Sequence, residues 1–159
     1  MQLQLEKMQS SDVPEVAQIE KLCFSQPWSE NGFRTALEYD YNCYLVARKS
    51  VQTADENLTG GIAGYCGLQQ SFEDAEILNV AVRPDQRGQG IAFSMLQRLM
   101  EIGRERGVER FTLEVRKSNA AALHLYEKLG FVSAGIRRNF YEKPVEDAVI
   151  MWTESDSTI

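Results

Sequence analysis

The sequence has few of the side chains that bind metals or cross-link a chain. Of its 159 residues one is histidine, His124, and three are cysteine, with no Cys-x-x-Cys pair. A zinc site uses several such ligands at short spacing, so we expect no metal. The cysteines, Cys23, Cys43 and Cys66, lie far apart and are odd in number. This pattern predicts small, reduced core residues rather than a disulfide framework.

Long apolar runs and an excess of positive charge are also absent. No stretch approaches the roughly 18 apolar residues of a membrane span, and the first residues lack the apolar core of a signal peptide. We therefore expect a cytoplasmic protein that binds no membrane. The formal net charge of -6 disfavours general attraction to nucleic acid. The length suits one domain, which we place at residues 1–153, followed by a polar tail at 154–159.

Hydrophobic periodicity predicts the element order β-α-α-β-β-β-α-β-α-β-β. Helices are expected from Asp12 with Glu15 in a capping box, after Ser29 as a cap, over 91–103, and over 119–129 with Ser118 as the cap. Strands are expected over 3–8, 41–49, 61–69, 77–82, 111–115, 132–138 and 148–153. The recurrent glycines Gly61, Gly64 and Gly67 indicate bends or close packing. The order predicts a mixed α/β (α+β) fold with a mixed sheet and helices on both faces.

The segment from Glu76 to Met100 combines a strand, a glycine turn and a helix. This arrangement presents free backbone N–H groups and a helix dipole to a phosphate. The Gly88-Gln89-Gly90 pair alone is a weak signal. It lacks the third glycine of a dinucleotide fingerprint and the Gly-Lys-Ser/Thr of a nucleotide P-loop. A turn that serves only as a tight connection remains an alternative.

Read as a whole, the segment resembles a known family. Asn79-Val80-Ala81-Val82 followed by Arg87-Gly88-Gln89-Gly90-Ile91-Ala92 resembles the acetyl-CoA motif of the GCN5-related N-acetyltransferase (GNAT) superfamily. Glu114-Val115-Arg116, Asn119-Ala120-Ala121-Ala122 and the stretch from Leu125 to Phe131 also fit it. The resemblance implies a GNAT fold, with a twisted, mostly antiparallel sheet of six to seven strands, and acetyl-CoA as co-substrate. It implies cofactor contacts by Val80, Ala81, Val82, Arg87, Gly88, Gln89, Gly90, Ile91, Ala92, Phe93 and Asn119.

A narrower similarity concerns the acceptor. Gln26-Pro27-Trp28-Ser29 and the segment from Ile136 to Met151 are similar to the RimI-type ribosomal-protein-alanine acetyltransferases. The similarity implies acetylation of the N-terminal alanine of ribosomal small-subunit protein eighteen. We expect the protein to be a monomer or weak dimer that binds no nucleic acid directly. Other N-termini, lysines or a small amine remain alternative acceptors. A non-catalytic acetyl-CoA-binding regulatory module is a further alternative, which the presence of both Glu114 and Tyr126 disfavours.

Acetyl transfer to an amine needs a base for the amine and an acid for the leaving thiolate. A protein α-amine has a pKa of about 8, so a base of modest strength suffices. By resemblance Glu114 is the base and Tyr126 the acid. The alternatives are a solvent-facing charge on an alternating strand for Glu114 and an aromatic packed on the core for Tyr126. Trp28 and Tyr141 are candidates to shape the acceptor groove, although simple packing is an equal alternative for Trp28.

Overall fold

The computed structural model describes residues 2–50 and 61–153. The polar stretch from Ser50 to Thr59, which the sequence predicts to be a loop, lies outside the described residues except for Ser50, which ends a strand. The predicted tail at 154–159 also lies outside them. The helices are α1 (Val13–Cys23), α2 (Glu30–Leu37), α3 (Ile91–Glu105) and α4 (Ala120–Lys128), with short 3-10 turns η1 (Ser10–Asp12) and η3 (Pro84–Gln86). The strands are β1 (Gln2–Lys7), β2 (Asn42–Ser50), β3 (Gly61–Ser71), β4 (Asp74–Val82), β5 (Arg110–Arg116), β6 (Phe131–Glu142) and β7 (Val145–Thr153).

The described strands hydrogen-bond in the order β1-β2-β3-β4-β5-β7-β6. The β1–β2, β2–β3, β5–β7 and β6–β7 pairs are antiparallel, and β4 pairs with β5 in parallel. The predicted mixed, mostly antiparallel sheet is therefore confirmed. By contacts the chain forms two compact units, Met1–Gln69 with Leu78–Leu99, and Gln70–Ile77 with Met100–Ile159. The single domain over 1–153 stays a prediction.

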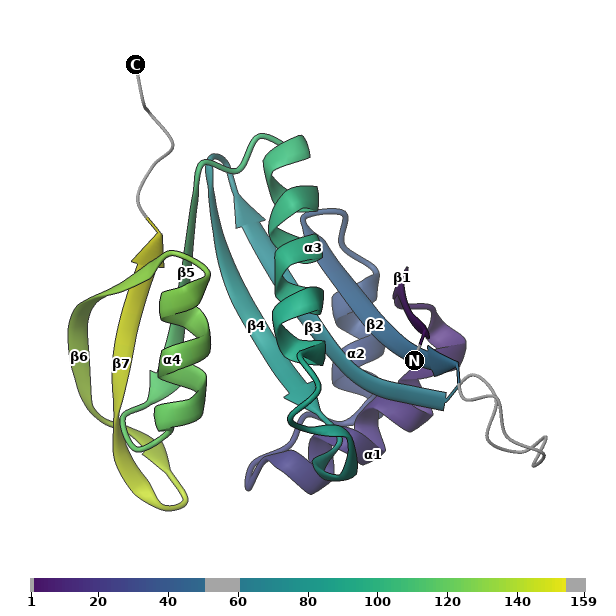
Figure 1. The fold of residues 1–159 in the computed structure, drawn as a ribbon, viewed down its shortest axis with the longest axis horizontal. Coiled ribbons are helices and arrows are strands. Elements are labelled where there is room, and N and C mark those ends of the chain that lie inside the picture. The colour runs from purple at the N-terminus through teal and green to yellow at the C-terminus, as the bar shows by residue number, and fades with distance from the viewer. Residues whose placement is uncertain (1, 51–60, 154–159) are drawn as a thin grey trace. The chain divides into compact units, whose positions relative to one another are not determined.

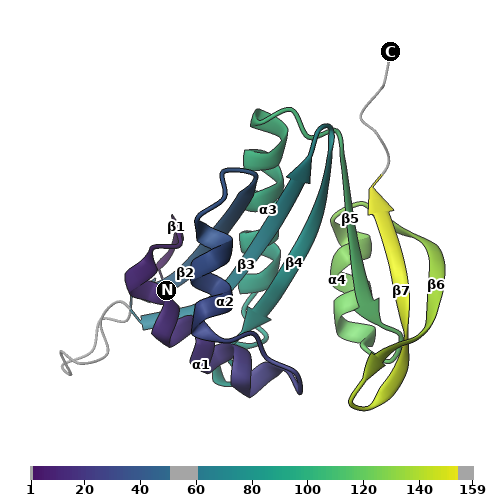
Figure 2. The same ribbon diagram turned by 180° about the vertical axis from the view of Figure 1, so that it is seen from behind.

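The first unit has helices on both faces of its strands. Figure 1 shows α3 in front of β3 and β4, and Figure 2, seen from behind, shows α1 and α2 on the opposite face. Its core joins the apolar face of α1 to the inner side chains of β2 and β3. The buried members of this cluster are Met8, Val13, Val16, Ala17, Ile19, Phe33, Tyr44, Val46, Ile62, Tyr65 and Ala81. Cys43 and Cys66 are buried free cysteines and Cys23 is partly buried, as predicted.

Two of the three recurrent glycines on β3 are sites of close packing. A Cβ on Gly64 would lie 2.7 Å from the Ala81 carbonyl oxygen, and one on Gly67 would lie 2.2 Å from Cε1 of Tyr44. Gly61 has no atom within 4 Å of an added Cβ, so close packing does not explain that position.

Gly67→Ala should destabilise the protein by about 3 kcal/mol, because the buried Tyr44 ring would have to move to accept the methyl group. Equilibrium urea unfolding measures the loss. Gly61→Ala is the matched control on the same strand, and its free energy of unfolding should stay close to that of the parent. Equal losses in the two variants would contradict the packing explanation.

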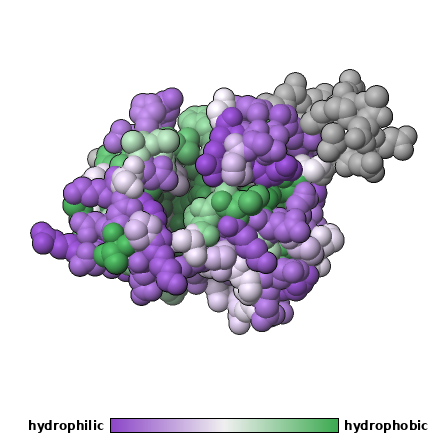
Figure 3. Space-filling view, turned by 90° about the horizontal axis from the view of Figure 1, so that it is seen from below, coloured by the Kyte–Doolittle hydropathy of each residue, from purple (hydrophilic) through white to green (hydrophobic). Residues whose placement is uncertain are grey.

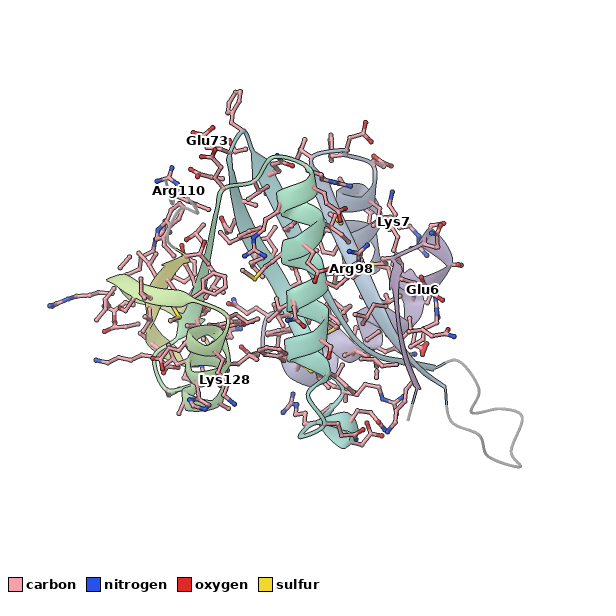
Figure 4. The ribbon with its side chains drawn as sticks, turned by 45° about the horizontal axis from the view of Figure 1, so that its top comes forward. Glu6, Lys7, Glu73, Arg98, Arg110 and Lys128 are labelled. Atoms are coloured by element: carbon pink, nitrogen blue, oxygen red, sulfur yellow. The ribbon has the colours of Figure 1, made fainter. Side chains whose placement is uncertain are left out.

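The second unit is a sheet of β5, β7, β6 and the start of β4. Asp74 to Glu76 pair with Arg110 to Thr112, and Leu113 and Val115 alternate inward along β5. Arg110 bonds Asp74 through its guanidinium at 2.9 Å and the Glu73 carbonyl through its backbone N–H at 3.1 Å. Figure 4 shows Glu73 and Arg110 close together at the end where β4 begins. In Figure 1, α4 lies on one face of this unit, in front of β5.

Several large apolar side chains remain exposed, and four of them, Val132, Ile136, Phe140 and Val145, lie on β6 and β7. Figure 3 shows a face covered mainly by hydrophilic residues, with hydrophobic residues visible between them. Leu22, Phe72 and Val145 are the most exposed of the large apolar side chains in the described residues, at 67%, 88% and 67%. They belong to different elements, and single exposed apolar residues are normal on a protein surface.

Three local expectations were wrong. Asp12 does not form a capping box with Glu15, because its carboxylate accepts the Gln9 N–H at 2.9 Å and pairs with Arg48. Asn119, not Ser118, caps α4, since its Oδ1 accepts the Ala122 N–H at 3.1 Å. β6 and β7 run to Glu142 and from Val145, so the long connection expected over 139–147 is mostly strand.

Candidate active site

The glycine turn forms an open backbone cradle at the start of α3. Gly88 and Gly90 have φ values of 79° and 76°, the left-handed region that favours glycine. Among the described residues, no atom lies within 4 Å of a Cβ added to either. The Ser94 N–H bonds the Gly90 carbonyl at 3.1 Å, so the N–H groups of Ile91 to Phe93 precede the first intrahelical bond. These donors and the helix dipole fit a phosphate group.

Side chains of the first unit hold this cradle from two sides. The Arg87 guanidinium donates to the Val82 carbonyl at 3.2 Å and to Cys23 Sγ at 3.5 Å. On the other side Lys49 Nζ contacts the side-chain oxygens of Gln86 at 2.7 Å and Gln89 at 3.0 Å. Sequence reasoning missed Lys49, which lies on β2, far from the turn along the chain.

β4 is irregular just before the cradle. Asn79 has φ 47°, unusual for a residue with a side chain, and its Oδ1 accepts the Tyr44 hydroxyl at 3.4 Å. A backbone break of this kind disturbs the regular pairing of a strand and redirects its N–H groups. The predicted contacts of Val80 to Val82 with a pantetheine chain would use such groups.

Glu114 lies on β5, at the middle of the second unit's sheet. Its side chain is 20% exposed, and Oε1 lies 3.3 Å from Nε of Arg137. Its Oε2 is buried without a hydrogen-bond partner in the described structure. A buried carboxylate oxygen with no partner is rare, because burying it without a hydrogen bond is costly. This oxygen is therefore placed where it could accept a hydrogen bond from a bound molecule.

Two further ionisable groups lie near this carboxylate. Desolvation and the Glu114 charge raise the pKa of Glu76 above its usual value of 4.5, with Arg137 opposing. Burial and the same carboxylate raise the pKa of the Tyr141 hydroxyl, while Arg116 lowers it. The carboxylates of Glu76 and Glu114 thus lie near each other, and Arg137 is the cation that pairs with Glu114.

Glu76→Gln should make the protein slightly more stable at neutral pH. Because the folded state raises the pKa of Glu76, it binds that proton more tightly than the unfolded chain. This contribution favours the folded state at low pH and is lost as the pH rises above 4.5. Glu76 reaches solvent, so the gain should stay within about 0.5 kcal/mol. Urea unfolding at pH 5 and pH 7.5 measures it. A variant that loses stability at the higher pH, relative to the exposed control Glu109→Gln, would contradict the assignment.

Tyr126 lies on α4 and is 8% exposed. Its ring packs edge-on against Phe131 at a centroid distance of 5.9 Å. Packing therefore accounts for the position of the ring. His124, two residues away, is exposed.

Tyr141 is held by an arginine from β5. The Arg116 guanidinium lies over the Tyr141 ring at 4.3 Å and donates to the carbonyl oxygens of Pro144 at 3.0 Å and Lys143 at 3.2 Å. It also pairs with Glu146 at 3.3 Å. One side chain thus fixes both the ring and the turn between β6 and β7.

Trp28 lines an open hollow in the first unit. The hollow has a volume of about 420 Å³ and is bounded by Trp28, Ser29, Gly32 and Thr35. The indole packs on Phe33 at a centroid distance of 5.4 Å. Trp28 therefore both packs against Phe33 and lines a surface hollow.

The predicted residues thus fall into two groups. The first unit holds Trp28, Val80 to Val82 and the cradle from Arg87 to Phe93. The second holds Glu114, Asn119, Tyr126 and Tyr141, and of these it brings Tyr141 under the influence of Glu114. The roles in binding and catalysis stay predictions. Within the described residues, no helix has the length and apolar character to cross a membrane, and no group of His, Cys, Asp and Glu side chains is placed to hold a metal ion.

Comparison with known proteins gives a consistent result. The sequence profile of the family described as "Acetyltransferase (GNAT) family" matches residues 13–131. Two curated proteins named [ribosomal protein bS18]-alanine N-acetyltransferase are similar to this chain. That of Escherichia coli K12 is 35% identical over 149 residues, 92% of this chain and 94% of its own. That of Salmonella typhimurium is 38% identical over 146 residues, 91% and 92% of the two chains.

Comparison with solved structures agrees with the comparison of sequences. The crystal structure of the ribosomal-protein-S18-alanine N-acetyltransferase from Escherichia coli has a TM-score of 0.81 at 31% identity, covering 99% of both chains. Arabidopsis thaliana NAA60, solved in complex with a bisubstrate analogue, has a TM-score of 0.86 over 99% of this chain and 100% of its own. At 15% identity, that second likeness concerns the fold alone.

Proposed function

The chain belongs to the GNAT acetyltransferase family, and we propose that it acetylates the N-terminal alanine of ribosomal protein bS18. It is an acetyl-CoA-dependent N-acetyltransferase. Relatives more than 90% covered by this chain carry the bS18-alanine name, which supports the choice of acceptor. The acceptor would be a newly made ribosomal protein, so we place the reaction in the cytoplasm, with no direct contact to nucleic acid or membrane and with the enzyme as a monomer or weak dimer.

The observation that carries the chemistry is the buried, unpartnered Oε2 of Glu114. A partnered carboxylate would have to break a bond before it could accept a proton, whereas this oxygen has none to break. Glu114 accepts the proton that the α-amine releases, directly or through a water molecule. As the amine nitrogen bonds the acetyl carbonyl carbon, the bond from that carbon to sulfur breaks. The Tyr126 hydroxyl gives its proton to the departing sulfur.

The remaining residues bind and orient. When bound, acetyl-CoA supplies the activated acetyl group. The cradle from Arg87 to Ala92, with Phe93, presents its N–H groups to the pyrophosphate, and Val80 to Val82 offer backbone groups to the pantetheine chain. Asn119 would contact the cofactor through the part of its amide that does not cap α4. Trp28 and Tyr141 bind the acceptor.

An acceptor panel tests the proposal. Consumption of acetyl-CoA is measured with peptides that share the bS18 sequence after the first residue and begin with alanine, serine, methionine or glycine. An N-terminally blocked peptide with a free lysine is the control. The alanine peptide should give the highest kcat/KM, since the similar enzymes are named for an N-terminal alanine. The lysine control should react slowest, because a lysine with a pKa of about 10.4 is almost fully protonated at neutral pH. Equal rates for all peptides would rule out the proposed acceptor.

A further inference from the structure

Glu20 is a buried carboxylate that the proposed chemistry does not use. It lies on α1 and is 2% exposed. Each of its oxygens accepts a hydrogen bond: Oε2 from the backbone N–H of Trp28 at 2.9 Å, and Oε1 from the Tyr65 hydroxyl in a short bond. Burying a carboxylate is costly, and at Glu20 two hydrogen-bond donors offset that cost.

The Tyr65 bond connects Glu20 to the sheet. Tyr65 lies on β3 and is fully buried, and its ring packs edge-on against Phe33 at 5.7 Å. Burial first, and then the Glu20 charge, raises the pKa of the Tyr65 hydroxyl. The hydroxyl therefore stays protonated and donates. Its position on a central strand gives Glu20 a rigid support.

The Trp28 bond connects Glu20 to the segment between α1 and α2. Ser29, the next residue, caps α2 by accepting the Gly32 N–H at 3.1 Å. The Trp28 ring packs on Phe33 from the same helix. The backbone of Trp28 is therefore fixed by Glu20 on one side and by the first turn of α2 on the other. Trp28, Ser29 and Gly32 are among the residues that line the open hollow.

We propose that Glu20 is a positioning residue that sets acceptor affinity, by fixing the Trp28 segment so that its hollow receives the N-terminal residues of the acceptor protein. The inference rests on the proposed function for the identity of the acceptor. The positioning itself is a property of the first unit. Glu20 acts through Trp28 and takes no part in proton transfer.

A fluorescence measurement tests the positioning without any activity. The protein has two tryptophans, Trp28 and Trp152, so Trp152→Phe leaves Trp28 as the single reporter. In that background Glu20→Gln replaces one acceptor oxygen by an NH₂ group and cannot serve both donors. Its Trp28 emission should shift to longer wavelength and be quenched more strongly by acrylamide. Glu15→Gln is the matched control, since Glu15 on the same helix also accepts a backbone N–H, that of Ile62 at 2.9 Å.

Steady-state kinetics tests the consequence. With the alanine peptide as acceptor, Glu20→Gln should raise the KM for the peptide about tenfold, as expected for loss of one hydrogen bond to a charged group. The KM for acetyl-CoA should stay within about twofold and kcat should change little, because the cradle and Glu114 are untouched. Glu15→Gln should leave both KM values unchanged.

The outcomes separate the two proposals. Unchanged Trp28 fluorescence in Glu20→Gln, or equal rises in both KM values, would overturn the positioning role. If the parent enzyme does not acetylate the alanine peptide, the proposed acceptor is wrong, and the fluorescence measurement alone then decides whether Glu20 positions Trp28.

If Glu20→Gln does not fold, Glu20→Asp is the second variant. It keeps the charge but shortens the side chain, and it should show the same peptide-selective change to a smaller extent. Parent-like fluorescence and peptide KM in Glu20→Asp would then overturn the role.

Discussion

Tyr126→Phe should lower kcat by a factor of about 10² to 10⁴ and leave the KM for acetyl-CoA almost unchanged, as expected for loss of a general acid. The variant keeps the ring and hence its edge-on contact with Phe131 at 5.9 Å. Only the hydroxyl is removed, so sulfur would have to depart as an unprotonated thiolate. Single-turnover rates of acetyl transfer, measured beside thermal unfolding, separate a chemical loss from a folding defect.

Two controls sharpen this result. His124→Gln removes the protein's single histidine, which is exposed on the same helix, and its rate should lie within about twofold of the parent. An acetyl donor with a more acidic thiol than CoA should restore part of the rate of Tyr126→Phe, because such a thiolate needs less protonation. A parent-like rate in Tyr126→Phe would remove the hydroxyl from the mechanism.

Periodicity and turn chemistry predicted the elements that build the cradle. The apolar run ending at Pro84 gave β4, and the faces of the following helix gave α3, whose Ile91, Met95 and Leu99 are buried. Gly88 and Gly90 were recognisable because a left-handed backbone needs glycine. Each of these features depends on residues that are neighbours in the chain, so the sequence is sufficient to predict it.

Two of the wrong predictions concern helix caps, where several neighbouring side chains have a suitable sequence context. Asp12 has the expected sequence context of a helix cap, yet it faces Gln9 and Arg48, the latter from β2. Ser118 and Asn119 are both good caps, and the backbone at the end of β5 decides between them by placing Oδ1 of Asn119 on the Ala122 N–H. Propensity alone could not distinguish these neighbours.

The partners of the candidate groups were also beyond sequence reasoning. Arg137 meets Glu114 only because β6 and β5 both flank β7. The local sequence does not distinguish Glu20 from an exposed charge on a helix, whereas the structure buries it against Tyr65 on β3. Glu76 left one usable signal, a carboxylate in an otherwise apolar stretch from Ala75 to Leu78. Tertiary pairing, rather than local pattern, thus determines the electrostatics of the site.

Glu114→Gln should lower kcat/KM for the alanine peptide by about 10²-fold at pH 7, because the amide keeps the shape of the side chain but cannot accept a proton. Its pairing with Arg137 at 3.3 Å is partly exposed and contributes little to stability, so thermal unfolding should change little.

The pH dependence distinguishes a lost base from a lost contact. The acceptor amine has a pKa of about 8 and becomes neutral as the pH rises, so it then needs less help from a base. The deficit of Glu114→Gln should therefore narrow between pH 7 and pH 9, whereas a binding defect would stay constant. Glu127→Gln, an exposed carboxylate on α4, serves as the control and should match the parent at every pH. A deficit that is independent of pH would instead assign Glu114 to acceptor binding, through a hydrogen bond that both the charged and the neutral amine can donate.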